Sequence, residues 1–536
     1  MTASTPGGAP SRARRRTGML RTKPVEHVLA QGGDDGDAGG GREEHGRLRK
    51  QLGPFDLMGF GIGIVIGTGI FTLTGVEAKN HAGPGILLSF LIGGVVSLLA
   101  ALCYAELASS VPTAGSAYTY AYATIGEVFA WIIGWDLVLE FALGSSVVAR
   151  GWSGYLANLF GLPPAWFAEE GSVVNLGAIA IVLVLGAVAM LGIRESARVT
   201  NLLVLVKIAI CVFVVVAGLF FVKRSNITPF VPPSQPAQDG ASGLTRPLTQ
   251  VLLGVEPQAF GVAGILTAAA VVFFAYTGFE AVANLGEETR RPQRDLPLGL
   301  LGTLGISTAL YVGVSFVVVG MVDYRQIDEA APIADAFDQV GLGWASTLVS
   351  VAAVAGLTSV ILVDLVAMGR IGFAMGRDRL LPRSVAAVHP RWGTPYRITA
   401  FTTLLVAALA GFVPLAELAE LVSIGTLFAF VVVSLAVPIL RRTRADLPRP
   451  FRVPLSPVVP VLSAVACLYL MANLAVETWL RFAVWMVLGL AVYLLYGRRN
   501  ARLAQPDAGP VVVDVRDDAA RARHGDDAAG HTQHHD

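Results

Sequence analysis

The strongest constraint on this chain is a glycine-rich stretch inside a hydrophobic segment that is long enough to cross a bilayer. The stretch reads Gly63-Ile-Val-Ile-Gly-Thr-Gly-Ile-Phe-Thr-Leu-Thr-Gly75. Gly67 and Gly69 lower helix propensity in mid-segment, and a helix break in lipid must face protein or a wet cavity. The two half-helix ends offer N–H groups to an anion and carbonyls to a cation, which together suit a zwitterion. Close helix packing is the alternative, because Gly63-x-x-x-Gly67 also matches a helix-contact motif.

A second interrupted segment follows about 210 residues later. It runs from Val271 to Glu288 and carries Gly278 and the acid Glu280 within an apolar sequence. Interrupted hydrophobic segments at corresponding places in two halves of a chain are the best sequence indication of a transporter binding site. The second segment therefore favours binding as the role of the first.

The composition is typical of a membrane protein. Of the 536 residues, 54% are hydrophobic and 15% are charged, and the mean hydropathy is +0.61. An ordinary soluble domain is less apolar. The three cysteines, Cys103, Cys211 and Cys467, lie in separate apolar runs and indicate neither a disulfide framework nor a metal site. The spans contain no nucleophile–base pair, phosphate loop or metal-ligand cluster, so we expect no enzymatic activity, cofactor, metal ion or nucleic-acid partner.

We predict an all-α core of twelve transmembrane helices at 51–500, between two disordered polar tails at 1–50 and 501–536. The predicted spans are 55–74, 84–109, 127–149, 173–192, 200–222, 260–286, 299–321, 343–374, 398–413, 416–440, 456–475 and 478–497. Arginines gather in the loops after spans 4, 6, 8 and 10, whereas the loop after span 7 is acidic. The positive-inside rule then places both termini in the cytoplasm. The sequence does not indicate an oligomeric state.

Five ionisable residues fall inside predicted spans, where charge is costly and usually functional. Asp136 and Glu140 share one face of span 3, because they are spaced i,i+4. Lys207 lies in span 5, Glu280 in span 6 and Asp364 in span 8. For Asp136 we favour a structural hydrogen bond near a helix end. Lys207 either has a buried function or snorkels to the surface, and its position in the sequence does not decide between them.

A series of motifs resembles amino-acid permeases of the amino acid–polyamine–organocation superfamily, and within it the bacterial relatives of cationic amino acid transporters. The motifs occur in this order over most of the chain: Ile66-Gly-Thr-Gly-Ile-Phe71, Tyr104-Ala-Glu-Leu-Ala108, Gly115-Ser-Ala-Tyr-Thr-Tyr-Ala-Tyr122, Gly134-Trp-Asp-Leu137, Gly151-Trp-Ser-Gly-Tyr155, Phe273-Phe-Ala-Tyr-Thr-Gly-Phe-Glu280, Glu287-Glu-Thr-Arg-Arg-Pro-Gln-Arg-Asp-Leu-Pro297, His389-Pro-Arg391, Thr394-Pro-Tyr-Arg397 and Ser423-Ile-Gly-Thr426. The resemblance implies a LeuT-type fold of five-plus-five inverted repeats, at about 55–222 and 260–440, followed by two extra helices at about 456–497.

The resemblance also implies a binding site between spans 1 and 6. The substrate carboxylate is expected on the break at Gly67 to Gly69, and its ammonium on carbonyls of both breaks. The substrate-binding residues implied are Ile66, Gly67, Thr68, Gly69, Ile70, Phe273, Phe274, Ala275, Tyr276, Gly278 and Asp364. Phe273 and Phe274 match the region of an aromatic gate, although plain packing explains either one equally well.

Proton coupling is implied by four further matches: Lys207, Glu140, Glu280 and Tyr311. A lysine ammonium in span 5 can supply the charge that sodium supplies in other members of the fold. Two positions depart from the family pattern in a minor way, since Glu280 replaces a common aspartate and Phe141 a common tyrosine.

The more informative departure is Asp364, where relatives carry methionine or another apolar residue. An unpaired carboxylate in the substrate pocket is costly unless a cation meets it. We therefore expect a proton-coupled importer that prefers cationic amino acids such as arginine, lysine and ornithine. A permease for small neutral amino acids, an amino-acid exchanger, a channel or facilitator, and a transporter-like sensor are the alternatives.

Overall fold

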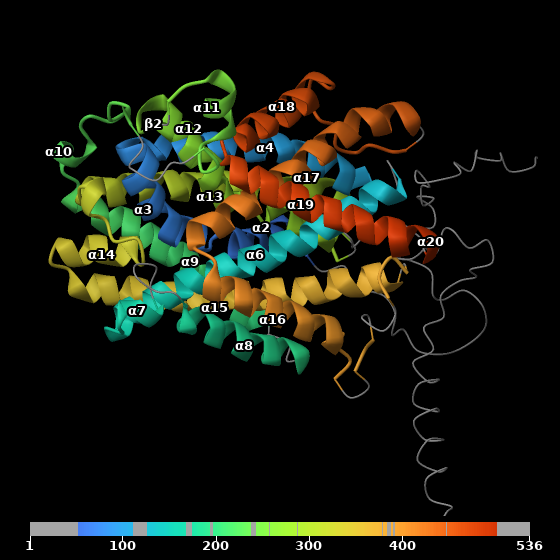
Figure 1. Cartoon of the computed structure of the whole chain (residues 1–536), viewed down its shortest axis with the longest axis horizontal. Helices are drawn as coiled ribbons and strands as arrows, with labels where there is room; N and C mark the ends of the chain where they lie inside the picture. The colour runs from blue at the N-terminus through green and yellow to red at the C-terminus, as the bar shows by residue number, and fades with distance from the viewer. Residues whose placement is uncertain are drawn as a thin grey trace, which may run out of the picture.

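The computed structural model describes residues 52–110, 126–167, 174–192, 197–236, 243–256, 258–286, 288–377, 379–382, 387–389, 392–445 and 447–500. The predicted tails and the motif Gly115–Tyr122 lie outside these residues. Helices dominate the described chain (Figure 1). The one sheet among the described residues is a two-residue antiparallel pair, β1 (Gln235–Pro236) with β2 (Gln258–Ala259).

The first half of the chain is built from two broken helices and four longer ones. Its helices are α2 (Pro54–Val65), η1 (Gly69–Leu73), α3 (Thr74–Glu77), η2 (Ala78–Ala82), η3 (Gly83–Gly85), α4 (Ile86–Ser110), α6 (Glu127–Phe160), α7 (Pro164–Phe167), α8 (Leu176–Met190), α9 (Ala197–Gly218), η4 (Leu219–Phe221), α10 (Arg224–Ile227), α11 (Leu248–Leu253), α12 (Gly261–Val272), η5 (Phe273–Tyr276) and η6 (Phe279–Leu285). Here η marks a 3₁₀ or π turn.

The second half consists mainly of longer helices. They are α13 (Pro292–Met321), η7 (Tyr324–Gln326), α14 (Pro332–Gln339), α15 (Gly343–Arg377), α16 (Tyr396–Phe412), α17 (Leu415–Thr443), α18 (Val458–Ala472), α19 (Val476–Val492), η8 (Tyr493–Gly497) and α20 (Arg498–Asn500).

Eight helical segments of the described chain are long and apolar enough to cross a membrane, and four shorter apolar helices accompany them. One long segment, Gly69–Ser110, joins the second half of predicted span 1 to span 2 through π and 3₁₀ turns. The predicted end of span 3 at residue 149 is wrong. The helix α6 continues to Phe160, and Gly161 ends it with a left-handed φ of 61°.

Many large apolar side chains lie on the outside of this helical bundle. The most apolar 18-residue window of Asn201–Phe221 has a mean hydropathy of 3.0, but only 33% of it is buried, and Leu205 and Val216 are 62% and 55% exposed. Exposing such an apolar surface to water is unfavourable, whereas exposing it to lipid is not. The chain is a polytopic, multi-pass membrane protein.

The helices pack in pairs around the two broken segments (Figure 1). The long α6 packs along α15, α4 packs along α13, and α8 packs along α16. The broken segments pack against each other, since η1 contacts η5 and α2 contacts η6. Both breaks therefore lie inside the protein, as backbone that is irregular at membrane depth must.

An ion pair between a buried glutamate and a partly exposed arginine fixes one end of α4 to the end of α17. Arg441 donates from Nε and Nη2 to the two carboxylate oxygens of Glu106, at 2.8 and 2.5 Å. The backbone N–H of Val453 donates to the same carboxylate at 2.7 Å, so Glu106 also holds the loop after α17. The Glu106 side chain is 2% exposed. A bidentate arginine pair of this kind is both strong and geometrically specific.

Candidate functional site

The first helix break is where the glycines predict it. The helix α2 stops at Val65, Ile66 adopts an extended conformation, and helical structure resumes at Gly69. The first N–H groups of a new helix have no intrahelical acceptor, so the second half presents donors at the break. This arrangement confirms the predicted interruption in span 1.

Two glycines of this break serve different purposes. A Cβ on Gly69 would lie 2.4 Å from Cβ and 2.5 Å from Cα of Ala275, so Gly69 allows spans 1 and 6 to touch. A Cβ on Gly67 would meet no atom within 4 Å, and Gly67 lines a pocket. Gly69 therefore combines a close contact between spans with a place in the pocket lining, whereas Gly67 is open toward the pocket.

The second break lies at Thr277 and Gly278. Gly278 has φ of +94°, and a Cβ there would come within 2.5 Å of Ile64 Cγ2, so both conformation and space require glycine. The two carboxylate oxygens of Glu280 accept from the Gly278 N–H at 3.2 and 3.1 Å. Glu280 therefore fixes the start of the second half-helix of this segment.

One hydroxyl joins the two breaks. The Tyr311 hydroxyl on α13 lies 2.6 Å from the carbonyl oxygen of Val65 and 2.9 Å from that of Ala275. A hydroxyl carries a single hydrogen, so it donates to one of these carbonyls at a time. The two carbonyls therefore share one hydrogen-bond donor, and each keeps a lone pair that can accept a hydrogen bond from a further donor.

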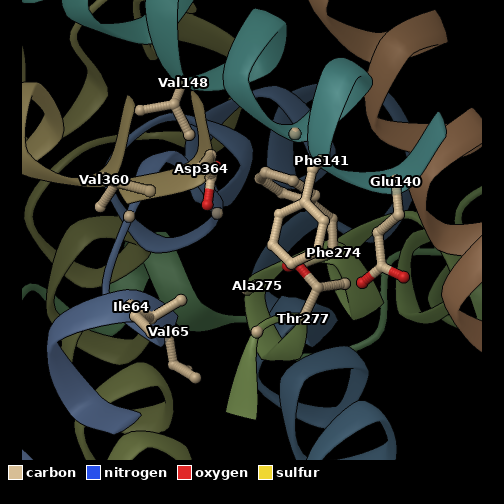
Figure 2. Close-up of a pocket in the computed structure, with 14 residues that line it drawn as sticks. Ile64, Val65, Glu140, Phe141, Val148, Phe274, Ala275, Thr277, Val360 and Asp364 are labelled. Atoms are coloured by element: carbon tan, nitrogen blue, oxygen red, sulfur yellow. The ribbon is translucent and has the colours of Figure 1, made fainter. Parts of the chain in front are cut away.

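A small pocket lies between the breaks and helices α6 and α15. Figure 2 shows the Asp364 carboxyl on one side of it and the Glu140 carboxyl on the other, with the rings of Phe141 and Phe274 between them in this view. The lining residues are Ile64, Val65, Gly67, Gly69, Glu140, Phe141, Gly144, Val148, Phe274, Ala275, Thr277, Gly278, Val360 and Asp364.

The structure brings seven of the predicted site residues to this pocket: Gly67, Gly69, Glu140, Phe274, Ala275, Gly278 and Asp364. The other eight do not line it: Ile66, Thr68, Ile70, Phe273, Tyr276, Lys207, Glu280 and Tyr311. Six of these eight have packing or hydrogen-bonding roles, including Glu280 and Tyr311, described above, and Lys207, described below. The Phe273 ring packs edge-on against Phe430, the Tyr276 hydroxyl donates to the Phe90 carbonyl at 2.7 Å, and a Cβ on Gly151 would lie 2.5 Å from Thr68 Cγ2.

Lys207 is buried at 1% exposure and makes a hydrogen bond from Nζ to the carbonyl oxygen of Gly63 at 2.6 Å. The alternative that this lysine snorkels to the surface is wrong. Its aliphatic stem lies against Gly356 of α15, where a Cβ would be 3.0 Å from Lys207 Cε. Lys207 therefore connects α9 to α2 and α15 without lining the pocket.

Asp364 faces α6 across the pocket. A Cβ on Gly144 would be in ordinary contact with Asp364 Oδ2, at 3.8 Å, so the glycine leaves room in front of the carboxyl. Lys207 and Glu280 both interact electrostatically with Asp364. On the other side of the pocket, the carboxyl groups of Glu140 and Glu280 are within hydrogen-bonding reach of each other. Such a bond between two acids requires a proton on one of them.

Several pocket residues and one buried charge lie outside the predicted site. Gly144 and Val148 continue the i,i+4 series from Glu140, and Val360 precedes Asp364 by four residues, so helical spacing could have found them. Arg150, at 6% exposure, donates to the carbonyls of Ala410 and Val413 at 3.0 and 2.6 Å. It was missed because span 3 was predicted to end one residue before it.

A profile of the family described as "Amino acid permease" matches residues 52–493, which include both breaks and every lining residue of the pocket. The chain belongs to the amino acid permease family. The family motifs quoted from the sequence are thereby confirmed as indications of an amino acid–polyamine–organocation permease. Members of this family are transporters and not enzymes.

Three curated relatives show how the permease compares with transporters of different names. It is 41% identical to the methylthioribose transporter of Bacillus subtilis (strain 168), over 90% of this chain and 99% of that one. It is 42% identical to the branched-chain amino acid permease BcaP of the same organism, over 85% and 95%. It is 38% identical to the vacuolar cationic amino acid transporter 4 of Arabidopsis thaliana, over 75% and 64%.

Proposed function

We propose that this permease imports amino acids across the cytoplasmic membrane by proton-coupled symport, with a preference for cationic amino acids. The observation that carries the proposal is the pocket in which two helix breaks meet the Asp364 carboxyl. The breaks suit the α-carboxylate and α-ammonium groups that all amino acids share. The carboxyl suits a cationic side chain.

The head group of the substrate would lie between the breaks. Its carboxylate would accept from N–H groups that begin the half-helix at Gly69, where the helix dipole also favours an anion. Its ammonium would donate to the carbonyl oxygens of Val65 and Ala275, which share the single hydroxyl hydrogen of Tyr311. Both ends of the zwitterion are then satisfied by backbone, which makes the head-group site independent of the substrate side chain.

The fold proposed is the LeuT-type five-plus-five inverted repeat with twelve spans. Packing between corresponding spans supports it: α4 of span 2 pairs with α13 of span 7, α6 of span 3 with α15 of span 8, and α8 of span 4 with α16 of span 9. Spans 1 and 6 are both broken and pack at their breaks. The repeats cover about 55–222 and 260–440, and the arginine distribution supports cytoplasmic termini.

Alternating access follows from where the irregular backbone lies. Spans 1 and 6 each have two half-helices joined at the pocket, so one half can move while the other stays packed. Lys207 holds the half of span 1 that precedes the break, through the Gly63 carbonyl. Loss of its proton would leave a weaker hydrogen bond in place of a charge-assisted one, and so release that half-helix. Glu140 and Glu280 would hold the second exchangeable proton.

The preference for a cation rests on Asp364. A charge-assisted hydrogen bond to its carboxylate is worth roughly 1.5–3 kcal/mol, which corresponds to one to two decades of affinity. Lys207 also acts on Asp364, so the substrate cation would join an existing charge pair instead of meeting a lone acid. A preference, and not an absolute requirement for cations, is the expected result.

Competition uptake in proteoliposomes tests this proposal. Labelled arginine and labelled alanine are measured in wild type and in the Asp364→Met variant, with and without an inward pH gradient. We expect the variant to lose its arginine preference and keep alanine uptake. An arginine preference that survives the substitution would make Asp364 structural. Exchange without net uptake would instead identify an exchanger, and non-saturable flux would identify a channel or facilitator.

A second candidate is a permease for neutral apolar amino acids. The pocket lining supports it, because Ile64, Val65, Val148 and Val360 are aliphatic and Phe141 and Phe274 are aromatic. The relative named as a branched-chain amino acid permease supports it as well. In this case Asp364 would be neutral, and labelled leucine would outcompete arginine in the same assay.

A further inference from the structure

Asp136 is the buried acid of α6 that the transport mechanism above does not use. Its side chain is 0% exposed, and neither carboxyl oxygen has a hydrogen-bond partner among the described residues. The structural hydrogen bond that the sequence analysis favoured is therefore absent. An unpaired carboxylate within a membrane span is costly, so a group in this position needs a functional reason.

The other acids of α6 are satisfied. Glu127 accepts a hydrogen bond from the Tyr493 hydroxyl at 2.9 Å, and Glu140 is within hydrogen-bonding reach of Glu280. The nearby tryptophans Trp131 and Trp135 donate to carbonyls at 2.8 and 3.0 Å. Asp136 therefore lacks a hydrogen-bond partner on a helix in which Glu127, Trp131 and Trp135 are paired.

The space around Asp136 is shaped for its carboxyl. A Cβ on Gly425 of α17 would lie 2.9 Å from Asp136 Oδ1 and 3.9 Å from Oδ2, so the carboxyl rests against backbone that only glycine leaves open. The hydroxyl of the next residue, Thr426, is buried and interacts with the Glu140 carboxyl, one turn along α6 from Asp136. Asp136 therefore lies against the backbone of α17, and its carboxyl is not bonded to any described side chain in this conformation.

Asp136 also lies in a row of acids that leads to the pocket. It is one helical turn from Glu140, which it affects electrostatically, and Glu140 reaches Glu280. On the elements packed against α6, the titratable groups near this row are Glu280 on η6, Asp364 on α15 and Tyr493 on η8. No cation of the described residues pairs with Asp136. A proton is therefore the ligand that neutralises it.

We propose that Asp136 is a third proton-binding site, which exchanges a proton with the Glu140–Glu280 pair and carries it along α6 away from the pocket. The proposal rests on the proton coupling proposed above. In the proposed orientation, α6 begins at Glu127 on the cytoplasmic side, so Asp136 lies on the route by which a proton leaves the pocket for the cytoplasm. The proton moves from one carboxyl to the next carboxylate, so no bond other than O–H is made or broken.

The test uses the Asp136→Asn variant in proteoliposomes, because asparagine keeps the shape and removes the titratable group. Uptake driven by a pH gradient should fall by about tenfold or more, as expected when a proton-transfer group is removed. Arginine counterflow, which needs no net proton movement, should be unchanged. Asp136→Glu should restore part of the gradient-driven uptake. The matched control is Asp338→Asn, an acid paired with Ser346 in α15, for which both activities should stay at wild-type level.

Infrared difference spectroscopy gives a readout that is independent of transport. The wild type should show a carboxylic acid C=O band that responds to pH and arginine, and Asp136→Asn should lack it. The Gly425→Ala variant should shift that band, because its methyl group displaces the carboxyl without removing it. Retention of both the band and gradient-driven uptake in Asp136→Asn would overturn the proposal. Wild-type uptake that ignores the pH gradient would overturn the proton coupling instead, while the band still decides whether Asp136 binds a proton.

Discussion

Lys207 on α9 donates a hydrogen bond from Nζ to the carbonyl oxygen of Gly63 on α2, at 2.6 Å. The two helices meet closely at this point, because a Cβ on Gly63 would lie 2.5 Å from Val204 Cγ2. The same lysine packs on Gly356 of α15. A single buried cation therefore connects the half-helix before the first break to a helix that lines the pocket. Any change in its charge acts on both.

The first prediction concerns Lys207. Lys207→Met keeps the apolar stem and removes the ammonium, so it should abolish stimulation of uptake by an inward pH gradient while counterflow exchange persists. Sodium should not stimulate wild-type uptake. Radiolabelled uptake at several internal and external pH values measures both. The control is Lys223→Met, which changes an exposed lysine and should have no effect. Unaltered proton stimulation in Lys207→Met would remove this lysine from the coupling mechanism.

The second prediction concerns Gly67, whose Cβ direction is open. Gly67→Leu should fold and insert normally, because the added side chain enters the pocket and no neighbouring atom blocks it. Substrate binding should be lost, since the side chain occupies the space beside the break. Thermal-shift measurements with arginine report both properties, as an unchanged melting temperature without ligand and a lost ligand-induced shift. A normal ligand shift would place the substrate elsewhere.

The third prediction concerns Gly69, where a Cβ would overlap Ala275. Gly69→Ala should destabilise the folded protein by about 1–3 kcal/mol, as overpacking of a tight contact does. The loss should appear as a lower melting temperature without ligand, in contrast to Gly67→Leu. Equal stability of the two variants would contradict the division of roles between the two glycines.

The fourth prediction concerns Tyr311. Tyr311→Phe removes the hydroxyl shared by the Val65 and Ala275 carbonyls, and each buried acceptor left without a donor costs about 1–3 kcal/mol. Without ligand the variant should melt at a lower temperature. A substrate ammonium can replace the missing donor, so arginine should stabilise the variant more than it stabilises wild type. Calorimetric melting with and without arginine measures the difference, and an equal ligand shift in both proteins would place the ammonium away from these carbonyls.

The sequence predicted the architecture well because its strongest signals are local. Long apolar runs predict spans, and glycines in mid-span predict the two breaks at Gly67 and Gly278. The reason for each glycine was not predictable, because the contact of Gly69 with Ala275 joins residues that are far apart in the chain. The packing of span 1 on span 6 is needed to show that Gly67 opens the pocket and that Gly69 allows close contact.

Buried charges marked the limit of sequence analysis. The burial of Lys207 depends on Gly63 and Gly356 approaching from two other helices. Among the described residues Asp136 lacks the expected hydrogen bond, because the facing residue is Gly425, which has no side chain to donate. Whether a charge in a span is paired is set by tertiary contacts, and helical periodicity gives only the face on which it lies.

The last prediction separates a buried ion pair from a surface one. Glu106→Ala removes the acceptor of two Arg441 bonds and of the Val453 N–H, and breaking a buried pair of this kind costs about 3 kcal/mol. The melting temperature in detergent should fall clearly, and proteolysis of the loop after α17 should accelerate. The control is Glu477→Ala, whose pairing with Arg481 is 29% and 39% exposed, and which should cost less than about 1 kcal/mol. Equal effects of the two substitutions would show that Glu106 does not hold the loop to α4.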